Sequence, residues 1–237
     1  MNFTPEQIRE LSVQFEGREP LDILQWAADQ FGSRLAISTA FGPDGLVIID
    51  IAQRKVTPRI PVFTIDTGFL FPETNELIGK LEREYGLTIE RLRHDETQTA
   101  AAGPELYRRD SNQCCYLRKV LPLQKKLPDL DALVTGLRRS QSATRGDTPI
   151  LQLQETPTGH RYVKINPLAT WTEEQVWWYI VSRQLDYNQL HDRGYASIGC
   201  TPDCCTRPVA EGEHERAGRW AGTAKKECGL HTFAANI

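Results

Sequence analysis

The six cysteines are the residues of this chain best suited to chemistry, and their spacing is uneven. They form an adjacent pair, a group of three and a single residue: Cys114 and Cys115, then Cys200, Cys204 and Cys205, and last Cys228. Neighbouring cysteines rarely bond to each other, because the peptide between them strains the disulfide. A structural zinc site favours Cys-x2–4-Cys pairs, whereas an iron–sulfur cluster takes four thiolates from wherever the fold brings them. The cysteines therefore indicate metal ligation or catalysis, with buried structural thiols as the alternative.

Guanidinium groups offer a second kind of chemistry, at Arg138, Arg139 and Arg145. Their planar donors pair with phosphate or sulfate oxygens two at a time. A run of arginines is usually a solvated face, but this one follows the apolar stretch 132–135, which predicts a buried strand. Since ligands lie beyond the carboxyl ends of such strands, we expect these arginines to face an anionic ligand.

The segment 38–45, Ser-Thr-Ala-Phe-Gly-Pro-Asp-Gly, follows another apolar stretch. A strand-to-helix turn with hydroxyls and glycines directs backbone N–H groups and a helix N-terminus toward a phosphate. The segment is not a Walker loop, because it lacks the Gly-Lys-Ser/Thr ending, and a Rossmann fingerprint is also absent. It is either a phosphate-binding turn of another kind or an ordinary connection between two elements.

Strands and helices in alternation must position these groups. A first helix is predicted to begin at Thr4-Pro5, since threonine caps helices and proline suits their first position. Apolar spacing then predicts strands at 35–38, 61–66, 87–92 and 132–135, a hairpin of 149–153 with 161–165, and helices at 20–31, 46–52, 72–85, 115–125 and 172–184. This order is typical of an α/β fold with a mostly parallel sheet that carries helices on both faces. The pattern beyond residue 190 is irregular.

Composition excludes several classes of protein. The chain has 237 residues, 28 Lys plus Arg and 31 Asp plus Glu, so its net charge of −3 argues against a nucleic-acid partner. We see neither a secretory signal nor an apolar stretch of the roughly 18 residues that span a bilayer, and expect no membrane partner. The expected location is the cytoplasm, where thiols stay reduced.

Four segments together resemble the adenylyl-sulfate and phosphoadenylyl-sulfate reductases. Residues 38–45 resemble the modified pyrophosphatase loop of that family, and residues 65–74 and 135–145 resemble its second and third signatures. Glu-Cys-Gly-Leu-His at 227–231 is similar to its catalytic tail. The motifs occur in the family's order and run through nearly the whole chain.

The resemblance implies an adenine nucleotide alpha-hydrolase type of fold and a set of site residues. It implies that Cys228 is the nucleophile, with nearby cations and His231 favouring its reactive thiolate. The substrate-binding residues that we expect are Ser38, Thr39, Phe41, Gly42, Asp66, Lys119, Gly136, Arg138, Arg139, Arg145, Arg216, Arg219 and His231. We expect residues 1–199 to form the nucleotide-binding domain, and residues 200–237 to hold a cluster-ligand loop, an arginine segment and the catalytic tail.

The resemblance also implies a [4Fe-4S] cluster held by Cys114, Cys115, Cys200 and Cys205. The family has two residues between the last two ligands, whereas this chain has Thr-Pro-Asp-Cys there. The sequence on both flanks favours Cys205 as the fourth ligand, with Cys204 as the competing choice. A zinc site or plain buried cysteines remain the alternative.

The expected reaction is reduction of adenylyl sulfate to sulfite and AMP in assimilatory sulfate reduction and cysteine biosynthesis. As the resemblance implies, Cys228 would carry an S-sulfonate that thioredoxin or a similar dithiol protein then reduces. The rivals are reduction of the 3′-phosphorylated nucleotide, use of both nucleotides, an ATP pyrophosphatase, and a non-catalytic iron–sulfur redox sensor that binds a nucleotide. A sensor would not need Cys228. We also expect a homo-oligomer.

Overall fold

The computed structural model describes every residue except 1, 2, 203, 204, 226, 232 and 237. The first helix, α1 (Pro5–Gln14), begins where the sequence predicts. Thr4 Oγ1 accepts a hydrogen bond from the Gln7 N–H at 3.2 Å, and Gln7 Oε1 accepts from the Thr4 N–H at 2.8 Å. This reciprocal capping box fixes the start of the helix. Helix α2 (Pro20–Phe31) follows.

One sheet organises the chain, in the strand order β3-β2-β1-β4-β6-β5-β7. Strands β3, β2, β1, β4 and β6 are parallel, whereas β5 and β7 run antiparallel to their neighbours. The strands are β1 (Leu35–Ser38), β2 (Val62–Asp66), β3 (Glu90–Arg93), β4 (Ala132–Val134), β5 (Leu151–Glu155), β6 (Arg161–Ile165) and β7 (Ala235–Asn236). The prediction of a mostly parallel α/β sheet is confirmed, including the β5–β6 hairpin.

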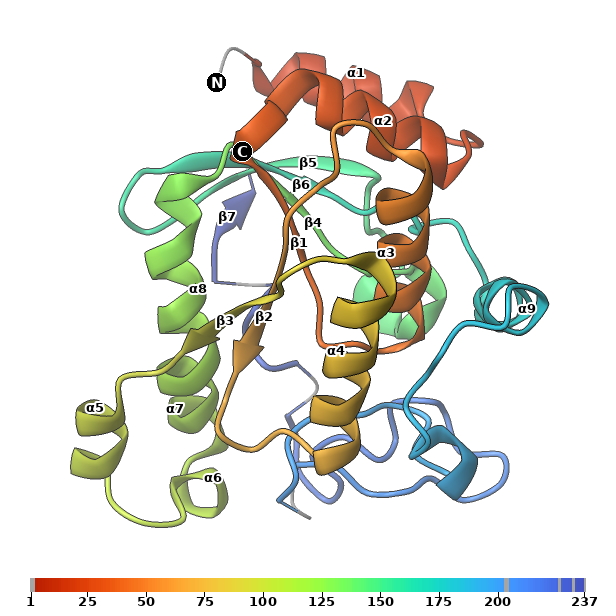
Figure 1. Cartoon of the computed structure of the whole chain (residues 1–237). Helices are drawn as coiled ribbons and strands as arrows, with labels where there is room; N and C mark the ends of the chain where they lie inside the picture. The colour runs from red at the N-terminus through yellow and green to blue at the C-terminus, as the bar shows by residue number, and fades with distance from the viewer. Residues whose placement is uncertain (1–2, 203–204, 226, 232, 237) are drawn as a thin grey trace.

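Helices fill the connections between the strands (Figure 1). The α-helices after α2 are α3 (Pro43–Lys55), α4 (Pro72–Tyr85), α5 (Glu96–Ala101), α6 (Leu106–Arg109), α7 (Ser111–Cys115), α8 (Leu121–Lys126) and α9 (Glu173–Ser182). A π-helical segment, Tyr116–Val120, joins α7 to α8. Short 3-10 turns occur at Gly32–Arg34, Leu127–Asp129, Arg139–Gln141, Ala143–Arg145 and His191–Arg193. The sequence did not predict α5 and α6, which are too short to show a clear apolar period.

Successive side chains of each strand point to opposite faces of the sheet, so the core has two layers, one on each face. Leu35 and Ile37 of β1 point into a large apolar cluster with residues of α1, α2, α3, α4 and α9. Ala36 points to the opposite face, where a second cluster contains Leu123 of α8 and Leu127. Successive side chains of a strand face opposite ways, so a parallel sheet must be covered on both sides. The predicted covering of both faces is confirmed.

The end of the chain returns to the sheet. Strand β7 pairs with β5, and Ala234 just before it packs in the second core cluster. Leu230 and Phe233 pack against the same cluster. This docking brings residues 227–231 across the carboxyl ends of the parallel strands. The sequence did not predict β7, because two residues show no period. Among the described residues, no helix is long and apolar enough to cross a membrane.

Candidate active site

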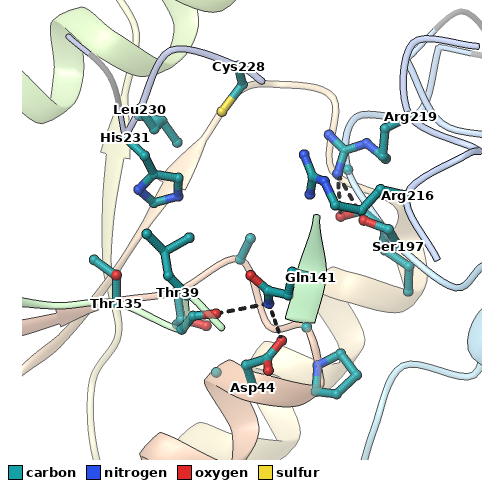
Figure 2. A pocket seen from close by; sticks show the side chains of 18 of the residues that line it. Thr39, Asp44, Thr135, Gln141, Ser197, Arg216, Arg219, Cys228, Leu230 and His231 are labelled. Carbon is teal, nitrogen blue, oxygen red and sulfur yellow. Dashed lines mark hydrogen bonds between the residues drawn. The ribbon is translucent and has the colours of Figure 1, made fainter. Parts of the chain in front are cut away.

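A cavity of about 250 Å³ opens at the carboxyl ends of β1, β2 and β4 (Figure 2). Parts of the chain far apart in sequence supply its walls: the turn after β1, the segment 64–74, Lys119, the turn after β4, the start of α9, the loop 196–200 and described residues of the segment 215–231. The cavity brings together these predicted residues: Ser38, Thr39, Gly42, Lys119, Gly136, Arg138, Arg145, Arg216, Arg219, Cys228 and His231. Three predicted residues, Phe41, Asp66 and Arg139, do not line it.

The turn after β1 is shaped by close contacts. Thr39 Oγ1 accepts a hydrogen bond from the Phe41 N–H at 2.9 Å, and Phe41 adopts a left-handed backbone with φ of 58°. That turn buries the Phe41 ring in the core, which corrects its prediction as a substrate-binding residue. A Cβ on Gly45 would lie 2.1 Å from Thr39 Oγ1, so only glycine lets α3 begin this close to the strand.

Asp66 stabilises the turn after β2 and does not line the cavity. Its Oδ1 accepts a hydrogen bond from the Gly68 N–H at 3.0 Å, and its Oδ2 lies 3.5 Å from Arg93 Nε. Gly68 has a φ of 74°, so the carboxylate stabilises a tight turn. The structure thus gives Asp66 a structural contact in place of the predicted contact with substrate.

Arg138 and Arg139 point in opposite directions. Arg138 is 3% exposed and lines the cavity, whereas Arg139 forms an ion pair with Glu16 beyond α1 and donates to the Thr148 carbonyl at 2.8 Å. Consecutive residues of a 3-10 turn diverge, so one of two adjacent arginines faces away. The structure thus places Arg139 outside the cavity lining, and its role in substrate binding stays a prediction.

A buried polar network surrounds Arg138. Its Nε pairs with Asp44, its Nη2 lies 3.3 Å from Glu215 Oε2, and its Nη1 donates to Ser140 Oγ at 2.6 Å. Gln141 Nε2 donates to Asp44 Oδ2 at 2.8 Å. Burial raises the pKa of the Glu215 carboxyl to about 7, although the charge of Arg138 opposes this shift. The sequence analysis missed Asp44, Gln141 and Glu215; each lies inside or beside a recognised segment, but none carries a charge that attracts an anion.

Arg145 and Arg216 converge on the carboxylate next to Cys228. Arg145 donates from Nε and Nη2 to the two oxygens of Glu227, at 2.9 and 2.8 Å. Arg216 Nη2 lies 3.3 Å from Glu227 Oε2. A bidentate arginine–carboxylate pair has the geometry of an arginine–phosphate pair. Glu227 therefore occupies the place on these arginines that an anionic ligand would take.

We expect Glu227→Gln to bind AMP about 3- to 10-fold more tightly than the unchanged protein, because the competing charge is lost. Glu211→Gln is the matched control, since Glu211 is exposed in the same part of the chain and does not line the cavity. Titration calorimetry measures both affinities. Equal or weaker AMP binding by Glu227→Gln would show that the carboxylate does not compete with the ligand.

Arg145 and Arg139 give a second paired prediction. Arg145→Ala should weaken AMP binding by about 1.5–3 kcal/mol, the usual value of a charged hydrogen bond. Arg139→Ala should leave AMP binding unchanged, because that side chain lies outside the cavity lining. The same titration distinguishes the two variants, and equal losses in both would contradict the placement of Arg139.

The positive charges around Cys228 come from residues other than its neighbours in the sequence. Cys228 lines the cavity, and Figure 2 shows it facing Asp44 and Gln141 across the open space. Burial and the cations Lys164, Arg145 and Arg216 hold the pKa of His231 well below its ordinary value. His231 is therefore uncharged near pH 7 and adds no positive charge to the cavity that it lines with Cys228.

Two lysines, Lys225 and Lys226, stand shortly before Cys228 in the sequence. Lys225 Nζ donates to the Ser111 carbonyl at 2.5 Å, and Lys226 lies outside the described residues. The nearby positive charges come from elsewhere in the cavity wall. Lys119, Arg145, Arg216 and Arg219 all line the cavity together with Cys228. The cations expected to favour the thiolate thus come from residues distant in sequence rather than from the tail itself.

Four cysteines line a second, smaller cavity beside the first: Cys114, Cys115, Cys200 and Cys205. All four are buried and free of disulfides. Cys205 is fixed by its own carbonyl, which accepts from Arg219 Nε at 3.2 Å and from the Trp220 N–H at 3.4 Å. The competing residue, Cys204, lies outside the described residues.

Lys119 lies between the two cavities, because it lines both. Burial disfavours its charge, but Cys200, Cys228 and Cys115 together outweigh that effect and raise the pKa of the Lys119 ammonium above its usual value. Thr67 Oγ1 lies 3.5 Å from Cys200 Sγ, and the charge of Lys119 lowers the pKa of that thiol against the effect of burial.

The second cavity has a volume of only about 10 Å³ in this structure, so its donor set, not its size, indicates what it could hold. Among the described residues, no three His, Cys, Asp or Glu side chains converge as the ligands of one metal ion. The donors around the cavity are instead four thiols with no carboxylate or imidazole. Four cysteine thiolates are the ligand set of a [4Fe-4S] cluster, in which the protein supplies sulfur only. The residues present therefore fit that group.

Comparison with known proteins gives the family. A family model described as the phosphoadenosine phosphosulfate reductase domain matches residues 34–208. A protein of Halalkalibacterium halodurans named adenosine 5′-phosphosulfate reductase is 43% identical over 228 residues, covering 94% of this chain and 96% of its own. One of Gloeobacter violaceus named phosphoadenosine 5′-phosphosulfate reductase is 44% identical over 235 residues, covering 98% of this chain and 96% of its own.

A solved structure agrees with these relatives. The phosphoadenylyl-sulfate reductase of Candida auris, crystallised as a phosphate complex, superposes with a TM-score of 0.72 at 32% identity. The match covers 84% of this chain and 97% of that one. The fold is accordingly of the adenine nucleotide alpha-hydrolase type that the sequence predicts. With a family model over most of its length and relatives above 40% identity, the chain belongs to the phosphoadenosine phosphosulfate reductase domain family.

Proposed function

We propose that the protein reduces adenylyl sulfate to sulfite and AMP. The observation that carries the proposal is the convergence of Cys228 with five cationic side chains on one cavity at the carboxyl ends of the strands. Relatives named adenosine 5′-phosphosulfate reductase match at 43% and 44% identity over 94% of the chain. Reduction of the 3′-phosphorylated nucleotide is the second candidate, because the relative from Gloeobacter violaceus carries that name at 44% identity.

The first step follows from the residues around Cys228. Its thiolate attacks the sulfur of the nucleotide, the sulfur–oxygen bond to the phosphate breaks, and AMP leaves with the electron pair. Arg145, Arg216 and Arg219 would hold the phosphate and sulfate oxygens, and Lys119 would offset negative charge on the departing group. The product on the protein is an S-sulfonated Cys228.

The second step needs a reductant that the chain does not contain. A dithiol protein of the thioredoxin kind would attack the Cys228 sulfur, release sulfite with the electron pair, and leave a mixed disulfide. Its second thiol would then free Cys228 and oxidise the dithiol to a disulfide. Cys228 is partly exposed on the docked tail, which is consistent with access by such a partner. A homo-oligomer stays a prediction.

We further propose that Cys114, Cys115, Cys200 and Cys205 hold a [4Fe-4S] cluster. The support is their common cavity and their all-sulfur chemistry. When bound, the cluster would supply an electrostatic and structural influence next to the substrate, while the dithiol protein supplies both electrons. Lys119 lies between the two cavities and would connect them electrostatically.

The direct test is turnover of the two nucleotides side by side with reduced thioredoxin. Sulfite release should be fast with adenylyl sulfate and at least about tenfold slower with the 3′-phosphorylated form, at equal concentrations. The reverse preference would establish the second candidate. Nucleotide binding without sulfite from either compound would favour the redox sensor instead.

A further inference from the structure

Cationic and acidic side chains are unevenly distributed around the cavity, and this distribution affects which nucleotide the cavity can bind. One side carries Cys228 together with Arg145 and Arg216, and with Glu227, whose carboxylate pairs with both arginines. Across the cavity from Cys228, Figure 2 places Asp44 and Gln141. Two further carboxylates, Glu173 and Glu215, also line the cavity. Since the sulfur of the substrate must reach Cys228, its phosphosulfate lies at the cationic side, and the nucleoside must extend toward the carboxylates.

Arg138 is the cation nearest to those carboxylates, and its nitrogens are already occupied. Nε pairs with Asp44, Nη2 with Glu215 and Nη1 with Ser140. The guanidinium is 3% exposed, which leaves it little surface for a ligand. The carboxylates of Asp44 and Glu215 are 13% and 14% exposed, so they meet the cavity with more of their surface than Arg138 does.

A ribose hydroxyl and a ribose phosphate would meet these groups very differently. A hydroxyl donates a hydrogen bond to a carboxylate and gains from the contact. A phosphate brings about two negative charges beside carboxylates in a site of low dielectric, where like charges repel strongly. The other cations lining the cavity in the described part of the chain are Lys119, Arg145, Arg216 and Arg219. Arg145 also reaches Gln141, whose Oε1 accepts from its Nη1 at 2.5 Å, but its remaining donors are paired with Glu227.

We infer that Asp44 and Glu215 are specificity-determining residues that select a nucleotide with a free 3′-hydroxyl over one with a 3′-phosphate. Both residues bind Arg138, which keeps this cation from attracting a phosphate. This inference rests on the proposed function and deepens it, because it gives a structural reason for adenylyl sulfate as the substrate. It gives a role to two acidic residues, whose negative charge does not by itself suggest contact with an anionic nucleotide.

Competition binding of AMP and adenosine 3′,5′-bisphosphate tests the inference without any turnover. The unchanged protein should bind AMP at least about tenfold more tightly than the bisphosphate. At pH 8, above the pKa of about 7 of Glu215, Glu215→Gln removes most of one negative charge and weakens the pairing with Nη2 of Arg138. The bisphosphate should therefore gain about 5- to 50-fold while AMP changes little. Asp44→Asn should shift the preference in the same direction. Glu211→Gln, an exposed change in the same segment, should keep the preference of the unchanged protein.

Retained AMP binding shows that a variant is folded, so each result can be interpreted. An unchanged preference in both Glu215→Gln and Asp44→Asn would overturn the inference, and so would equal binding of the two nucleotides by the unchanged protein. Failure of the proposed function has a different signature, since it shows as nucleotide binding without sulfite release, or as no nucleotide binding at all, whatever the preference between the two nucleotides.

Discussion

Replacing Cys228 by serine is expected to abolish sulfite release, with a loss of at least about a thousandfold in turnover. Serine has nearly the size of cysteine, but its hydroxyl is not ionised near pH 7 and makes a poor nucleophile at sulfur. The cavity wall should survive the change, because Glu227 and not Cys228 forms the ion pairs that hold Arg145 and Arg216 to the tail. The variant should therefore bind AMP with unchanged affinity. Sulfite assays with reduced thioredoxin and titration of AMP give both quantities.

The matched control is a cysteine outside the cavity lining, Cys205→Ser, which removes a thiol without removing the nucleophile. Its effect on turnover should come with a loss of iron, whereas Cys228→Ser should keep its iron. A Cys228→Ser protein that still released sulfite at a comparable rate would show that another group attacks the substrate.

The second large effect concerns the four buried cysteines. Protein purified without oxygen should be brown and contain about four iron atoms per chain, as one [4Fe-4S] cluster requires. Cys115→Ser or Cys200→Ser should remove nearly all of the iron, because each cluster iron depends on its own thiolate. Iron analysis and the visible absorption spectrum measure the loss. Anaerobic protein that contained zinc and no iron would contradict the cluster.

The same spectra decide between the two neighbouring cysteines of the second group. Cys205 lies with the other three thiols in one cavity, held by contacts from Arg219 and Trp220. We therefore expect Cys205→Ser to lose the iron and Cys204→Ser to keep most of it. The opposite pattern would make Cys204 the fourth ligand.

The sequence predicted the framework well, because the framework depends on local rules. Thr4 and Pro5 mark the start of α1, and the apolar runs at β1 and β4 mark buried strands. The cavity at the carboxyl ends of those strands follows from the topology of parallel sheets. The docking of the tail through β7 depends on long-range pairing with β5, and no local pattern reveals it.

The sequence identified most of the residues that the structure gathers at the cavity, but not the contacts that they make there. Arg138 and Arg139 are chemically identical, and only the direction of a 3-10 turn decides which one faces the cavity. Phe41 lies within a binding loop, but its left-handed backbone turns the ring into the core. Glu227 stands next to Cys228 in the sequence, yet its pairing with Arg145 depends on a contact across 82 positions.

The most direct test of the central claim is a single turnover of adenylyl sulfate without any reductant. The account predicts that each active site releases about one AMP and then stops, while the intact mass rises by about 80 Da for one SO3 group bound to a thiol. Peptide mapping should place that mass on Cys228, and reduced thioredoxin should release it as sulfite. Added mass on another cysteine, or AMP release with no added mass, would contradict the account.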